Sequence, residues 1–136
     1  MQLNPYLNFN GQCEAAFKFY EERLGGKILS MFPWGATPAA NMVGADWQQK
    51  IIHGTISVGG HDVMGCDAPP GRYSVPTGIQ LSLNVKDPAE ADRLFNALAE
   101  NGKVIMPLEK TFWAARFGMV TDQFGIPWMI NCEQPG

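Results

Sequence analysis

The feature that most constrains how this chain can fold is an internal repeat, because its two halves match each other at a constant offset. The matched positions include residues of every predicted element type, and each half reads as a strand, a helix and three more strands. One such half could not bury the apolar face of its sheet alone, so we expect two βαβββ modules that share a chain. The matches are Asn8 with Asn84, Glu14-Ala15 with Glu90-Ala91, Phe19 with Phe95, and Gly26-Lys27-Ile28 with Gly102-Lys103-Val104.

Local patterns give the elements of the first half. Apolar residues at helical spacing predict a helix from Cys13 to Leu24, and Gly25-Gly26 is a typical C-terminal stop. The remaining predicted elements are strands over 5–9 and 27–32, a long loop over 33–50, and a hairpin with strands over 51–58 and 62–66.

The second half follows the same plan. Asp87 is a suitable helix N-cap with Pro88 at the first helical position, and the predicted helix runs to about Glu100. The predicted strands cover 79–85, 104–106, 119–121 and 128–132. We therefore expect an α+β protein with a single domain over 1–136, built from a first module over 1–68 and a second over 77–134.

Composition excludes several classes of protein. The formal net charge is −3 and the chain has no run of basic residues, which argues against a nucleic-acid partner. No apolar run is long enough to span a membrane, and the first residues do not resemble a signal peptide. Three cysteines without CxxC spacing predict neither a disulfide framework nor a structural zinc site. These features together predict a cytoplasmic protein whose cysteines are small buried side chains.

Two segments resemble the PhnB-like branch of the vicinal oxygen chelate superfamily, also called the glyoxalase/bleomycin-resistance/dioxygenase superfamily. One is the opening, from Pro5 to Gly11 with Ala16, Phe19-Tyr20 and Leu24-Gly25. The other is Thr111–Ala114 with Phe117-Gly118, Val120–Asp122, Phe124-Gly125 and Trp128–Asn131. The resemblance spans residues 5 to 133. It implies a curved, trough-like mixed sheet, a small-molecule ligand in the sheet cavity, and a homodimer.

PhnB-like proteins often carry the label 3-demethylubiquinone-9 3-methyltransferase. The chain has no glycine-rich loop between its first strand and helix, where a nucleotide-type cofactor would need one. A methyltransferase is therefore the weakest of the alternatives that the resemblance brings.

The resemblance also implies four positions where superfamily enzymes hold a divalent ion with His, Glu or Gln side chains. By register these positions are Met64, Met129, Gln80 and Asn4, with Pro5 or Tyr6 in place of Asn4 if the register slips by one. Thioethers and neutral amides supply neither charge nor imidazole, so we expect no metal and no other cofactor. A metal-dependent lyase, isomerase or dioxygenase of the glyoxalase type is the alternative function.

His53 is the candidate for acid/base chemistry, because an imidazole titrates near neutral pH and its strand face also carries Thr55 and Ser57. The alternative is a hydrogen-bonded strand histidine without a catalytic role. His61 follows a glycine turn and is read as a solvated turn residue. Whether the protein is an enzyme therefore stays open.

Other candidates predict ligand binding. The polar stripe Gln80, Ser82 and Asn84 is expected to face the cavity or, alternatively, solvent. Aromatic side chains of the irregular segments suit an apolar pocket wall, a module core or a dimer interface. Arg116 and Lys110 suit an anionic group or a simple surface role. The predicted ligand-binding residues are Tyr6, Asn8, Trp34, His53, Gln80, Ser82, Trp113, Arg116 and Met129.

Overall fold

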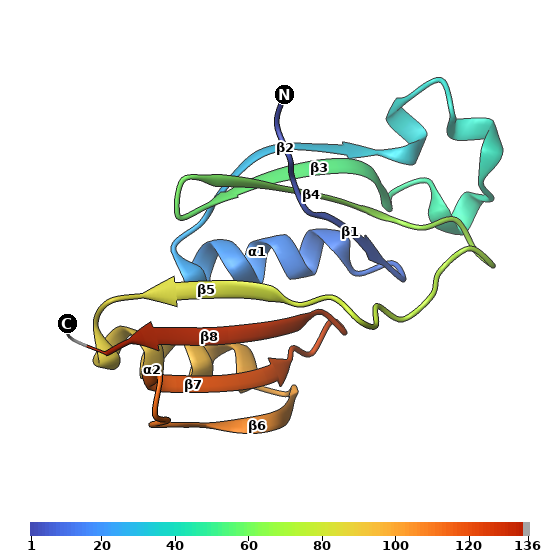
Figure 1. Ribbon diagram of the computed structural model, residues 1–136. Coiled ribbons are helices and arrows are strands. Elements are labelled where there is room, and N and C mark those ends of the chain that lie inside the picture. Colours follow the sequence, from blue (N-terminus) through green and yellow to red (C-terminus); the bar gives the residue numbers. More distant parts are fainter. Residues whose placement is uncertain (135–136) are drawn as a thin grey trace. The chain divides into compact units, whose positions relative to one another are not determined.

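The computed structural model describes residues 1–134, and the chain divides into two compact units, Met1–Ser74 and a second that begins at Val75. Each unit contains one four-stranded mixed sheet and one α-helix (Figure 1). The predicted α+β class and the doubled βαβββ order are therefore confirmed.

In the first unit the sheet order is β1-β4-β3-β2. Strand β1 runs parallel to β4, and the other neighbours are antiparallel. The elements are β1 (Tyr6–Phe9), α1 (Cys13–Leu24), β2 (Lys27–Pro33), β3 (Ile51–Val58) and β4 (His61–Asp67).

The second unit has the same topology, with the order β5-β8-β7-β6 and a parallel β5/β8 pair. The elements are β5 (Leu81–Val85), α2 (Pro88–Ala99), β6 (Lys103–Glu109), β7 (Ala114–Thr121) and β8 (Pro127–Glu133). Strands β6 and β7 are longer than predicted, because the sequence pattern marked only 104–106 and 119–121.

Helix α1 covers one face of the first sheet. Glycines in the sheet strands allow the helix to pack closely against that face. A Cβ atom built on Gly65 would lie 2.9 Å from the Phe17 ring, and one built on Gly54 would lie 3.3 Å from it. Phe17 is fully buried and meets Phe9 edge-on at 6.0 Å. The same close packing occurs in the second unit, where the Phe95 ring of α2 lies 2.9 Å from a Cβ atom built on Gly118.

The constant offset holds for the first two strands of each unit and fails for the buried face of the helices. Lys27 and Lys103 both begin a strand, as the alignment predicts. Phe19 and Phe95 also align, yet Phe95 is buried whereas Phe19 is partly exposed and lies 5.7 Å from the Arg23 guanidinium. The match of these two residues is therefore wrong as a structural equivalence, because the residue of α1 that packs on its sheet as Phe95 does is Phe17, two positions before Phe19.

Three carboxylates fix the ends of elements. Asp122 accepts hydrogen bonds from the backbone N–H groups of Phe124 (2.9 Å) and Ile126 (3.0 Å), which fixes the turn between β7 and β8. Asp87 accepts from Ala89 N at 3.0 Å, which confirms the predicted N-cap of α2. Asp67 is 1% exposed and accepts from Cys13 N (2.9 Å) at the start of α1 and from Ile51 N (2.8 Å) at the start of β3.

The predicted loop over 33–50 contains three short 3-10 helices, which are η1 (Trp34–Ala36), η2 (Ala40–Met42) and η3 (Ala45–Trp47). The Gln48 side-chain amide holds them together by donating to the carbonyl oxygens of Ala40 (2.8 Å) and Val43 (2.9 Å). Sequence periodicity cannot reveal such turns, because each is shorter than one repeat of the pattern. Among the described residues, no helix is long and apolar enough to cross a membrane.

Candidate functional site

Each sheet has a second face, opposite its helix, which we call the open face. Side chains alternate along a strand, so residues next to those that contact Phe17 or Phe95 point to the open face. In the first unit the open face is polar and sulfur-containing. Its side chains from β1, β3 and β4 are Tyr6, Asn8, His53, Thr55, Ser57, Met64 and Cys66.

Four of these side chains form a connected cluster, which we call the His53 cluster. The Tyr6 hydroxyl lies 3.5 Å from His53 Nδ1, and the two rings are 5.9 Å apart between centroids. The Cys66 thiol donates to Asn8 Oδ1 at 3.3 Å. Strand pairing explains the proximity, because Asn8 is the register partner of Cys66, and the Gly54–Gly65 pair places His53 beside Cys66.

Two ionisable groups of the His53 cluster, the Tyr6 phenol and the Cys66 thiol, are held in their neutral forms. Desolvation by burial raises the pKa of the Tyr6 phenol, and the neighbouring Cys66 raises it further. Desolvation also raises the pKa of Cys66, against an opposing effect of the nearby Tyr6 hydroxyl. Since the thiolate is the nucleophilic form of cysteine, these groups favour hydrogen bonding over covalent chemistry.

The open face of the second unit carries amides, a hydroxyl and thioethers. Ser82 Oγ and Asn131 Nδ2 both donate to Asn84 Oδ1, each at 3.3 Å. Gln80 Nε2 lies 3.2 Å from the Met119 sulfur. Within the described part of the chain, Asn131 Oδ1 is buried and has no hydrogen-bond partner. An unpaired buried acceptor is costly, so this oxygen is a candidate contact for a donor group of a ligand.

The aromatic candidates separate into two groups. Trp113 is 51% exposed and packs edge-on against Phe112 and Phe117, with ring centroids at 4.7 and 5.4 Å. Phe117 lies in the strand β7. Trp34 is 6% exposed and donates its indole N–H to the Asp67 carbonyl oxygen at 3.2 Å. The structure therefore places Trp34 in the core of the first unit rather than on the open face.

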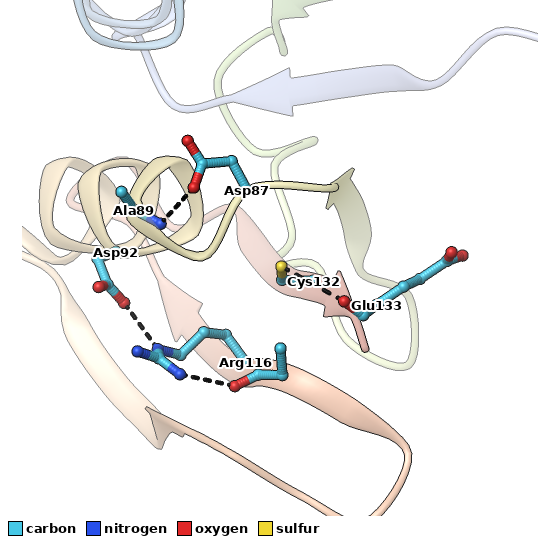
Figure 2. Close-up of polar contacts among 7 residues, drawn as sticks. Asp87, Ala89, Asp92, Arg116, Cys132 and Glu133 are labelled. Atoms are coloured by element: carbon cyan, nitrogen blue, oxygen red, sulfur yellow. Dashed lines mark hydrogen bonds and ion pairs between the residues drawn. The ribbon is translucent and has the colours of Figure 1, made fainter. Parts of the chain in front are cut away.

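Arg116 also differs from its prediction (Figure 2). Its guanidinium donates to Asp92 of α2 at 3.2 Å and to the Ala115 carbonyl oxygen at 2.8 Å. Arg116 shares its strand face with Gly118, which lies under α2. Because α2 covers this face and Asp92 neutralises the charge, Arg116 is not available on the open face for an anionic ligand.

The register places the predicted metal positions on the open faces. Tyr6 is the partner of Met64, and Ser82 is the partner of Met129. The Asn4 side-chain N–H₂ group donates to the Asp62 carbonyl oxygen at 3.0 Å, so Asn4 could contact an ion through its neutral side-chain oxygen. Two thioethers and neutral amides do not fit a hard or borderline divalent ion, which prefers carboxylate or imidazole. Residues 1–134 also contain no cluster of three or more His, Cys, Asp or Glu side chains that suits a metal ion.

A cavity of about 350 Å³ lies in the first unit at the start of α1. Sequence reasoning missed it, because its walls come from the loop over 33–50 and from the α1 terminus. Glu14, Asp46, Lys50 and Asp67 contribute its charged groups. Lys50 and Asp67 are already bonded within the chain, since Lys50 donates to Gly11 O at 2.9 Å and Asp67 accepts from two backbone N–H groups.

The chain is similar in sequence and structure to known proteins. The model of the Glyoxalase/Bleomycin resistance protein/Dioxygenase superfamily matches residues 2–130. The Escherichia coli protein YjdN is 37% identical over 145 residues, which cover 99% of each chain. The crystal structure of protein PA1353 from Pseudomonas aeruginosa is 50% identical, covers 99% of each chain and superposes with a TM-score of 0.87.

A Bacillus cereus structure has the same fold at lower identity. It carries the provisional description of a 3-demethylubiquinone-9 3-methyltransferase, PhnB protein. Its identity is 22%, its TM-score is 0.82, and the match covers 97% of this chain and 99% of that one. At this identity the likeness concerns the fold.

Proposed function

We propose that this chain, which belongs to the Glyoxalase/Bleomycin resistance protein/Dioxygenase superfamily, binds a small, partly apolar metabolite on its open faces without a divalent metal ion. The ligand is neutral or anionic and is held by hydrogen bonds. Neutral polar side chains beside thioether and aromatic groups are typical of a pocket for an organic molecule.

The observation that carries this proposal is the chemistry at the superfamily's metal positions. The family resemblance assigns Met64 and Met129 to two of them, and these residues are the register partners of Tyr6 and Ser82 on the neighbouring strands. A methionine side chain adds apolar surface and adapts its shape to a ligand. The same positions that would hold a hard ion in a metalloenzyme therefore support contact with an organic ligand here.

Binding can be tested with the fluorescent probe 8-anilinonaphthalene-1-sulfonate, which is partly apolar and carries one oxyanion. We expect saturable binding to the wild-type protein. Ser82→Trp fills part of the open face of the second unit. It should weaken binding of the probe about tenfold or more, which corresponds to about 1.4 kcal/mol of binding free energy. Lys18→Trp adds the same bulk to an exposed position of α1, where Lys18 pairs with Glu14, and should leave binding unchanged.

Equal binding by all three proteins would contradict the proposal, because the probe would then sit elsewhere. A requirement for added Mn²⁺ or Zn²⁺ would contradict its metal-free part and would favour the glyoxalase-type alternative.

A further inference from the structure

The proposed function leaves open which atoms of the ligand the protein recognises, and the His53 cluster narrows that choice. The cluster joins three strands, since Tyr6 and Asn8 come from β1, Cys66 from β4 and His53 from β3. A neutral imidazole has one N–H donor and one bare acceptor nitrogen, and the partner of one nitrogen decides what the other offers.

The relative acceptor strengths of the groups around Tyr6 favour one role for His53 Nδ1. The Tyr6 hydroxyl has a single proton and two neighbours that can accept it, the His53 imidazole nitrogen at 3.5 Å and the Cys66 sulfur. Imidazole nitrogen is the much stronger acceptor, because thiol sulfur accepts only weakly. The thiol proton of Cys66 is directed to Asn8 Oδ1 at 3.3 Å, which completes a consistent assignment.

Tyr6 is well suited to act as the donor. Tyr6 is 47% exposed, and its partial burial raises the pKa of the phenol, so the hydroxyl keeps its proton. Its ring also lies against the imidazole, with an interplanar angle of 35°, which restricts how His53 can turn.

From this geometry we infer that Tyr6 is a positioning residue that holds neutral His53 with its proton on Nε2, so that the open face presents an N–H donor to an oxygen atom of the ligand. The inference rests on the proposed function and specifies its ligand class as carbonyl, carboxylate or phosphonate compounds. The ligand oxygen accepts from Nε2, and no covalent step is involved.

The tautomer is measured by long-range ¹H–¹⁵N NMR on protein labelled at histidine, at about pH 9, where an imidazole of ordinary pKa is neutral. The chain has only two histidines, so His61 is an internal reference. We expect the bare-nitrogen shift at Nδ1 and the protonated shift at Nε2 of His53. Tyr6→Phe removes only the hydroxyl and should shift both signals toward averaged values, whereas Tyr73→Phe should change neither.

Protonation of Nδ1 in the wild-type protein would overturn the inference, and so would unchanged signals in folded Tyr6→Phe. The wild-type spectrum decides the first point even if the variant does not fold.

The ligand class is tested with two probes of similar size, phenylphosphonate and benzylamine. Phenylphosphonate should shift His53 Nε2, and His53→Ala should weaken its binding about tenfold, as expected for a lost hydrogen bond to a charged oxygen. Benzylamine should leave Nε2 unchanged.

The methyl signals of Met64 and Met129 distinguish failure of this inference from failure of the proposed function. If phenylphosphonate shifts these methyl groups but not His53, the inference is wrong and the proposed function stands. If it shifts none of them, both fail.

Discussion

At the residue scale, the Asp67 carboxylate joins two elements by accepting backbone hydrogen bonds from Cys13 and Ile51. An amide in its place loses the charge and brings an N–H₂ group toward another donor. We expect Asp67→Asn to lower the free energy of unfolding by about 1–3 kcal/mol, measured by urea denaturation. Asp62→Asn changes a less buried carboxylate on the same strand and should cost less than about 0.5 kcal/mol. Equal effects of the two substitutions would contradict this role.

Cys13 gives the folded protein a pH dependence in the alkaline range. Burial, and then the nearby Asp67 carboxylate, raise the pKa of this thiol. Above about pH 8.5 the unfolded chain therefore releases a proton that the folded chain retains, so stability falls as pH rises. Between about pH 8 and 10 we expect the wild-type protein to lose about 1–2 kcal/mol more than Cys13→Ala.

The packing cost of the Cys13→Ala substitution is measured separately at neutral pH, where the thiol is protonated in both states. Parallel loss of stability in the two proteins between pH 8 and 10 would show that Cys13 is not the group responsible.

At the element scale, each helix lies on glycines of its own sheet. A Cβ atom on Gly65 would lie 2.9 Å from Phe17 Cζ and 3.0 Å from the Leu7 carbonyl oxygen. Gly65→Ala should therefore destabilise the first unit by about 1–3 kcal/mol, measured by thermal or urea unfolding. Gly44→Ala introduces the same methyl group in a loop, at a backbone φ of −74°, and is the matched control.

The clash with Phe17 is separable from the clash with backbone. Adding Phe17→Leu to Gly65→Ala should recover part of the lost stability relative to the two single effects added together. Strict additivity would indicate that the Phe17 ring does not determine the requirement for glycine at this position.

The comparison of sequence with structure is also clearest at this scale. Helices α1 and α2 could be predicted almost to the residue, because Gly25 and Asp87 mark their ends with known capping chemistry. Strand β6 could not, since its residues are mostly exposed and show no alternation. The predicted Gln80, Ser82 and Asn84 stripe lies on the open face, whereas Trp34 and Arg116 do not. Their placement depends on tertiary partners, Asp67 and Asp92, that a single sequence does not reveal.

For the whole molecule, the superfamily resemblance leads us to propose a homodimer. Exposed apolar side chains such as Ile105 of β6 and Phe32 of β2 offer surface for association, at 54% and 52% exposure. Each chain has a mass of 15.0 kDa, so light scattering after size exclusion should give twice that value. A concentration-independent monomer mass would contradict the dimer, and a cytoplasmic location stays a prediction.

The central claim is that the superfamily's metal positions hold an organic ligand here rather than a divalent ion. The most direct test is native mass spectrometry of untagged protein before and after addition of Mn²⁺, Zn²⁺ or Ni²⁺. A variant with Gln80→His and Met129→Glu, both in the second unit, supplies an imidazole and a carboxylate and is the positive control. We predict no stoichiometric ion on the wild-type chain at concentrations that load the variant. One tightly bound ion per wild-type chain would contradict the account and would make metal-chelating oxygen compounds the next substrates to test.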